Sequence, residues 1–323
     1  MKRNRHLPAN LLLGALALLG RQAPANAAQF CVNTPADLQS ALNTAAGNGV
    51  DDEVRIVQGT YVGNFVYAST QPNNLSVLGG FTAGCAGREL DPVNTILDGN
   101  QTDRVLMLSA PEVAAGFLVE GLTLRNGQLA SGDGGGLFVG IGGTDGAVTV
   151  NGNEIKKNTA SQGGGAYLST TTTRLTNNNI TGNTSESGGG GVHIDGFISG
   201  ASAITATFTN NNITGNNSGI DGGGACIRGF YSDATTATFT NNNITGNTSM
   251  YGGGAYLAGD YYDGTTITAT FTNNNITGNT TAVDGGGAYI YATTATLTNN
   301  NITSNTTHNW AGGAYIDAIT ATL

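Results

Sequence analysis

The sequence predicts an all-β protein, a right-handed, single-stranded parallel β-helix with a short N-terminal capping helix. The first observation is a repeated phrase, clearest as Thr-Phe-Thr-Asn-Asn-Asn-Ile-Thr-Gly-Asn at residues 207–216, followed by Gly-Gly-Gly-Ala at 222–225. The second is the period, because successive Asn triplets start at residues 177, 210, 241, 273 and 299, which are 26 to 33 residues apart. A unit this short cannot enclose a core alone, so neighbouring units must stack into a solenoid.

Each repeat contains the elements of one coil. Residues 204–209 alternate apolar and Thr side chains, which is strand periodicity, and the Asn triplet at 210–212 favours a corner because Asn tolerates left-handed backbone. A second strand begins at Ile213, the Gly triplet turns the chain, and residues 225–227 form a third strand. We therefore expect three strands and three corners per coil. A helical repeat is excluded, because each Gly of the triplets would destabilise a helix by about 1 kcal/mol relative to Ala. The predicted inward residues are Ala206, Phe208, Ile213, Ala225 and Ile227.

Stacking places equivalent residues of successive coils about 4.8 Å apart. The Phe and Ile positions then form continuous apolar columns, and the Asn residues at the corners can form amide ladders. The Asn-Ile-Thr triplets also match the N-glycosylation acceptor pattern. Their recurrence with the period of the fold favours the ladder.

The N-terminal part differs from the repeats, and we divide the chain at residues 1–27, 28–100 and 101–323. Residues 1–27 combine a basic start, an apolar run and Ala-Asn-Ala, which is typical of a cleaved signal peptide. Thr34 and Pro35 predict a helix start, and this helix should cap the core of the irregular first coils in residues 28–100. The repeats of residues 101–323 stop in mid-phrase at Leu323, which favours a fragment over an end covered by another subunit.

Composition limits the partners and the compartment. The formal net charge is −9 and Lys and Arg are few, which disfavours nucleic acid as a partner. A signal peptide predicts a secreted protein or one on the bacterial cell surface, in the outer membrane or outside the cell, where disulfides form. We expect a Cys31–Cys85 disulfide, with two unpaired thiols as the alternative. Cys226 stands where other repeats carry Tyr, and we expect it on the surface.

Two phrases carry a resemblance to a known family. Residues 208–211 (Phe-Thr-Asn-Asn) and 223–225 (Gly-Gly-Ala) resemble the repeated motifs of polymorphic outer membrane proteins, and Leu122 to Gly127 is similar to wider groups of secreted bacterial β-helix proteins. The resemblance spans roughly residues 54–323 and implies a surface-displayed or secreted protein, several such relatives being adhesins. This chain departs from the motif where Tyr follows Gly-Gly-Ala.

Two outward surfaces are candidates for binding. The first is a Thr-x-Thr array that is similar to the ice-binding face of β-solenoid antifreeze proteins, the alternative being that Thr is simply a good strand former. Its residues are Thr205, Thr207, Thr209, Thr236, Thr238, Thr240, Thr268, Thr270 and Thr272. The second is a row that could stack on sugars or stabilise the solenoid by stacking between coils, and it contains Tyr167, Tyr256, Tyr289 and Tyr315.

Carboxylates suggest a third possibility, a polysaccharide lyase or hydrolase. Asp221 and Asp284 should lie two coils apart, near the separation found in inverting glycosidases. The repeats carry too few cations for lyase chemistry on uronates, so we predict no enzyme and no catalytic, metal or cofactor site. The favoured function is an adhesive or extracellular structural role, with ice binding second and polysaccharide processing third. Possible partners are glycans, a host or neighbouring cell surface, or the chain itself associating end to end.

Overall fold

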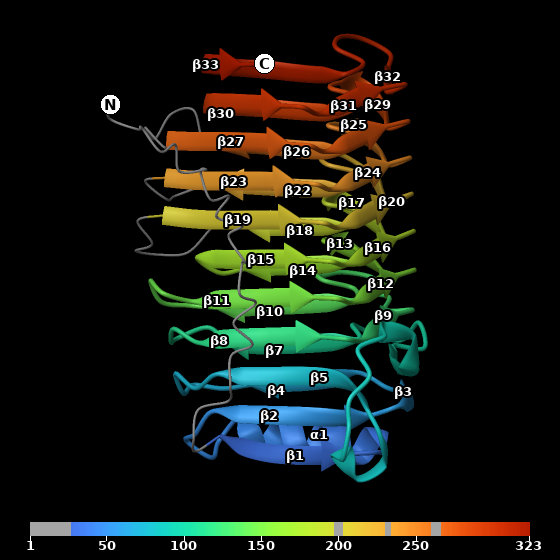
Figure 1. Cartoon of the computed structure of the whole chain (residues 1–323), viewed down its shortest axis with the longest axis vertical. Coiled ribbons are helices and arrows are strands. Elements are labelled where there is room, and N and C mark those ends of the chain that lie inside the picture. The colour runs from blue at the N-terminus through green and yellow to red at the C-terminus, as the bar shows by residue number, and fades with distance from the viewer. Residues whose placement is uncertain (1–26, 197–202, 230–233, 260–265) are drawn as a thin grey trace, which may run out of the picture.

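The computed structural model describes residues 27–196, 203–229, 234–259 and 266–323, and residues 1–26 of the predicted signal peptide lie outside them. The chain is a parallel β-helix whose coils stack from the N-terminal helix to the last strand (Figure 1). All pairings between strands of the described residues are parallel, as the repeat predicts. The fold class expected from the sequence is thereby confirmed.

The largest sheet contains two ladders of strands. The first ladder consists of β1 (Ala28–Val32), β2 (Asp52–Val57), β5 (Leu75–Phe81), β8 (Gly116–Glu120), β11 (Ala147–Asn151), β15 (Thr172–Thr176), β19 (Ala203–Thr209), β23 (Ala234–Thr240) and β27 (Thr266–Thr272). The second ladder consists of β4 (Phe65–Ala68), β7 (Leu106–Ala110), β10 (Leu137–Ile141), β14 (Ala166–Ser169), β18 (Val192–Asp195), β22 (Ala225–Gly229) and β26 (Ala255–Gly259). Both ladders meet in β30 (Ala288–Thr298), which pairs with β26 and β27 and then with β33 (Ala314–Thr322).

Two smaller sheets complete each coil. The nine-stranded sheet consists of β3 (Gly59–Val62), β6 (Thr95–Asp98), β9 (Thr123–Arg125), β12 (Glu154–Lys156), β16 (Asn179–Thr181), β20 (Asn212–Thr214), β24 (Asn243–Thr245), β28 (Asn275–Thr277) and β31 (Asn301–Thr303). The six-stranded sheet consists of β13 (Thr159–Gln162), β17 (Thr184–Gly188), β21 (Asn217–Ser218), β25 (Thr248–Tyr251), β29 (Thr280–Asp284) and β32 (Thr306–Thr307).

The expectation of three strands per coil is wrong, because the six-stranded sheet adds a fourth. Its buried inward positions are Ala160 and, in the later strands, Ser185, Ser218, Ser249 and Thr281. Small hydroxyl side chains give no apolar alternation, so the sequence pattern does not reveal these strands.

The core consists of the predicted columns. Ala206, Phe208, Ile213, Ala225 and Ile227 are all buried. The ring centroids of Phe208 and Phe239 lie 4.4 Å apart, and those of Phe239 and Phe271 lie 4.6 Å apart. These distances are close to the spacing between neighbouring strands, so each coil adds one ring to the stack.

Two buried Asn ladders hold the corners. Their members are Asn153, Asn178, Asn211, Asn242, Asn274 and Asn300 in one ladder, and Asn158, Asn183, Asn216, Asn247, Asn279 and Asn305 in the other. The Nδ2 group of Asn211 donates to the Leu175 carbonyl at 2.9 Å and to Asn242 Oδ1 at 3.0 Å. Asn210 has the left-handed backbone that the corner requires, with φ 55°. The sequon residue Asn212 also donates its Nδ2 to Asn179 Oδ1 at 2.7 Å, as the ladder interpretation predicts.

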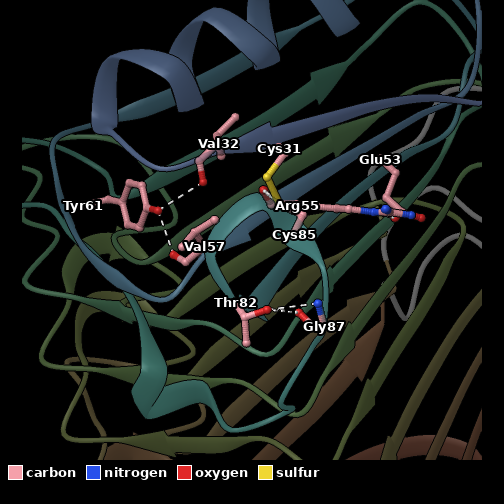
Figure 2. The surroundings of a disulfide bond; sticks show 9 residues. All are labelled: Cys31, Val32, Glu53, Arg55, Val57, Tyr61, Thr82, Cys85 and Gly87. Atoms are coloured by element: carbon pink, nitrogen blue, oxygen red, sulfur yellow. Dashed lines mark hydrogen bonds and ion pairs between the residues drawn. A yellow bond between two sulfur atoms is a disulfide. The ribbon is translucent and has the colours of Figure 1, made fainter.

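The N-terminal cap is a helix, α1 (Pro35–Ala45), with Thr34 as its N-cap. The Thr34 hydroxyl oxygen accepts from the Asp37 amide at 3.1 Å, and Leu38, Ala41, Leu42 and Ala45 are buried against the first coils. Cys31 of β1 is disulfide-bonded to Cys85 of η1 (Ala83–Cys85), with Cα atoms 5.8 Å apart (Figure 2). A second 3-10 helix is η2 (Pro92–Asn94). The bond ties the capped first coil to a segment 54 residues later.

Candidate functional site

A regular array of Thr side chains lies on the outward side of β19, β23 and β27, which we name the threonine face. It contains Thr205, Thr207, Thr209, Thr236, Thr238, Thr240, Thr268, Thr270 and Thr272, all half-exposed. The pairing register places them in three columns, so that Thr207 lies beside Thr238 and Thr238 beside Thr270. Inward residues such as Phe208 alternate with them and are buried, which fixes the outward direction of each Thr.

The hydroxyls of the threonine face lack protein partners. In the described part of the chain, none of the nine side-chain oxygens hydrogen-bonds to another group of the protein. Threonines on the smaller sheets behave differently, since Thr214 Oγ1 lies 3.2 Å from Thr245 Oγ1 and Thr280 Oγ1 lies 3.0 Å from Thr306 Oγ1. The threonine face therefore presents free donors and acceptors to whatever contacts it.

The array extends beyond these nine residues on one side and is interrupted on the other. Thr294, Thr296 and Thr298 of β30 continue the three columns beside β27. On the opposite side Arg174 of β15 lies in register with Thr207 and breaks the middle column. The uncharged part of the array accordingly begins at β19.

The predicted Tyr row is an aromatic column on the second ladder, but it is not an exposed row. Its rings are stacked with centroids 5.5 Å apart for Phe138–Tyr167, 5.3 Å for Tyr167–His193, 5.1 Å for Tyr256–Tyr289 and 4.8 Å for Tyr289–Tyr315. Tyr167 is only 9% exposed, while Tyr256, Tyr289 and Tyr315 are half-buried. Because neighbouring rings cover each other's faces, the column presents ring edges outward, and stacking between coils accounts for it.

The expectation that Cys226 lies on the surface is wrong. Cys226 lies in the aromatic column between His193 and Tyr256 and is fully buried. Burial raises the pKa of its thiol and lowers the pKa of His193 to about 3, so both groups are neutral at physiological pH. Neither a thiolate nucleophile nor a titrating base is therefore present at this position.

Asp221, one of the two carboxylates considered for catalysis, is engaged with another group. Asp221 is 5% exposed and forms an ion pair with Arg228. Burial raises the pKa of Asp221, and the hydrogen bond from Arg228 opposes that rise. Asp221 and Asp284 lie two coils apart, as predicted, because both bridge to Tyr251. An ion-paired, buried Asp221 is poorly placed to act with Asp284 on a substrate.

Of the other acids considered in the repeats, one is described and hydrogen-bonded and three lie outside the described residues. Asp195 accepts a hydrogen bond from the Tyr167 hydroxyl at 2.6 Å. Asp233, Asp260 and Asp263 lie outside the described residues. No three His, Cys, Asp or Glu side chains among the described residues lie close enough to hold a metal ion. None of the described helices is long and apolar enough to cross a membrane.

The sequence did not predict the roles of two residues of the second ladder, Phe138 and Arg228. Phe138 continues the aromatic column, and the Arg104 guanidinium lies 4.8 Å from its ring centroid. Phe138 stands two residues after Gly136, at the same phase as Tyr167 after Gly165, so the Gly triplet was the available signal. The ion pair of Arg228 with Asp221 has no comparable signal, because no other repeat carries it among the described residues.

Comparisons with known proteins give little beyond the fold. No family model matches the chain, and no curated protein matches it. Among solved structures it is similar to Escherichia coli YbhC, with 12% sequence identity and a TM-score of 0.37, over 84% of this chain and 75% of that one. A likeness at this level carries no argument about function.

Proposed function

We propose that the chain is a secreted or cell-surface, non-enzymatic β-helix protein with an adhesive or extracellular structural role. The single observation that carries the proposal is the contrast between its faces. The nine Thr side chains of the threonine face are uncharged and their hydroxyls are free of protein partners, whereas the titratable groups Cys226, His193 and Asp221 are buried. A scaffold built in this way offers contact area and little acid–base chemistry.

The resemblance to polymorphic outer membrane protein repeats supports a location outside the cell. In this chain Phe208 of the motif is core and the two Asn residues that follow form the corner, so the motif maintains the solenoid. The same residues say nothing of a ligand. The signal-like residues 1–27 provide the second support for export.

Localisation and adhesion can be tested with one set of strains. The full chain expressed in a Gram-negative host should appear in the outer membrane or the medium, and deleting residues 1–27 should retain it inside the cell. Cells or beads carrying the protein should adhere to solid surfaces or to other cells more than bare ones. Retention of the intact chain in the cytoplasm, or no adhesion on any surface tried, would contradict the proposal.

Polysaccharide processing remains the competing class. Incubation with pectin-like and other acidic polysaccharides should release neither unsaturated nor new reducing ends. If products form, Asp221→Asn and Asp284→Asn variants would show whether these carboxyls are responsible. Product formation lost in either variant would replace the adhesive proposal with an enzymatic one.

A further inference from the structure

We propose that the threonine face binds ordered water and, through it, the surface of ice. This inference rests on the proposed function, since it names the ligand of one outward face of a protein that acts by its surface. It starts from the nine free hydroxyls, which each offer one donor and two acceptor positions. Water molecules both donate and accept, so a hydroxyl lattice can join a network of water in a way that an array of ammonium groups cannot.

The geometry of the face is regular in two directions. Behind the face, the Phe rings of successive coils repeat at 4.4 Å and 4.6 Å, which sets the spacing across the strands. Along a strand, Thr residues at positions i and i+2 are about 6.6 Å apart. The face thus offers a lattice that is regular in two directions over three coils, to which an ordered layer of water can bind at several hydroxyls at once.

The side chains are also rigid and half apolar. Thr is branched at Cβ, so few χ1 rotamers are accessible, and each side chain lies between the neighbouring Thr residues of its column. Ordering the lattice on binding therefore costs little conformational entropy. The methyl groups exclude liquid-like water between the hydroxyls, and the hydroxyls anchor the water that remains.

Other ligand classes fit the face less well. Sugars and protein partners are commonly held by exposed aromatic or Arg side chains, and the described outward positions of β19, β23 and β27 carry neither. Anionic partners need cations, and the nearest in the array is Arg174 at its boundary. A neutral, rigid hydroxyl and methyl lattice favours water over these classes.

The test measures the freezing-point gap and the inhibition of ice recrystallisation by the full secreted chain. Thr238→Tyr places a bulky side chain at the centre of the face and should remove most of both effects. Thr277→Tyr is the matched control, because Thr277 is also outward and half-exposed but lies on β28 of another sheet. Both variants should keep the far-ultraviolet spectrum and the melting temperature of the parent, since neither residue enters the core.

Two smaller changes separate the contributions of the hydroxyl and the methyl group. Thr238→Val keeps the shape and removes the hydroxyl, whereas Thr238→Ser keeps the hydroxyl and removes the methyl group. We expect a partial loss of ice activity in both variants. Absence of ice activity in the parent chain, or equal losses in Thr238→Tyr and Thr277→Tyr, would overturn the inference. Adsorption to cellulose or chitin that Thr238→Tyr abolishes, without ice activity, would overturn it and leave the adhesive proposal standing. No binding to ice or to any surface would remove both.

Discussion

Replacing Asn211 by Ala tests the buried corner ladder most directly. The Asn211 side chain takes part in four hydrogen bonds: it accepts from the Asn178 amide and side chain, both at 3.0 Å, and donates to Leu175 and Asn242. Its residue is only 2% exposed, so water cannot easily replace these bonds. The substitution also leaves the Asn178 amide without the oxygen that it bonds in the parent.

The magnitude follows from the number of bonds. A typical hydrogen bond contributes about 0.5–1.5 kcal/mol net, and a buried donor left unmade costs about 1–3 kcal/mol. Four bonds at the middle of the first range predict a loss of about 4 kcal/mol in the free energy of unfolding. The neighbouring change Asn210→Gly is the control, because Asn210 is exposed, has φ 55° and its side chain makes only one long hydrogen bond, in which Nδ2 donates to Asn177 Oδ1 at 3.4 Å. Gly adopts that backbone without strain, so the control should alter stability by a few tenths of a kcal/mol.

Urea unfolding followed by circular dichroism gives the difference in unfolding midpoint between each variant and the parent. Amide hydrogen exchange shows which coils are destabilised. Exchange is needed because solenoids can unfold in parts, in which case protection is lost first in the coils next to Asn211. The reasoning would be refuted if Asn211→Ala and Asn210→Gly had equal effects, since the buried bonds would then contribute nothing.

Further predictions concern the Gly triplet, His193, the disulfide and Cys226. Gly223→Ala should destabilise by several kcal/mol in thermal unfolding, because a Cβ there would lie 2.5 Å from the Thr248 carbonyl oxygen, whereas Gly215→Ala meets nothing within 4 Å and should cost only about 1 kcal/mol for its left-handed backbone. Burial and the nearby Arg228 charge hold the pKa of His193 at about 3 in the folded protein. The free energy of unfolding should therefore be highest above the unfolded pKa of about 6.5 and fall as the pH drops from there towards 3, because the unfolded chain binds the proton more readily. His193→Phe should make the stability less dependent on pH in this range. Reducing Cys31–Cys85 should lower the stability of the cap by about 4 kcal/mol from loop entropy and speed hydrogen exchange in α1. The Cys226 thiol should resist alkylation in the native protein and react in denaturant; rapid native labelling would contradict its burial.

The periodic part of the fold could be predicted from the sequence because each position repeats its physical requirement. Asn210 and its equivalents adopt positive φ, where Asn is favoured among non-Gly residues, and Phe208 recurs where the core needs volume. Thr34 and Pro35 gave the start of α1 by the same kind of local argument. The conformation of these residues is determined by requirements close to them in the chain, and such requirements can be recognised in the sequence.

What the sequence did not reveal depends on contacts between neighbouring strands, either in adjacent coils or in the same coil. Alternation placed Tyr167 on the outward side correctly, but outward is not exposed when Phe138 and His193 cover both faces of its ring. The ion pair of Asp221 was not predicted, because its partner Arg228 belongs to the next strand of the same coil. A periodicity argument assigns sides of a strand; burial of an outward residue is decided by its neighbours.

The variation in repeat length indicates why the threonine face can stay regular. The second and first ladders are joined at one corner, where the link is residues 170–171 between β14 and β15 but residues 196–202 between β18 and β19. In β30 there is no link at all, because one strand runs through both ladders. The pairing of Thr207 with Thr238 and of Thr238 with Thr270 holds across repeats whose links differ in length. Differences in link length at this corner therefore leave the register of the face unchanged, so its lattice is determined by the pairing of β19, β23 and β27.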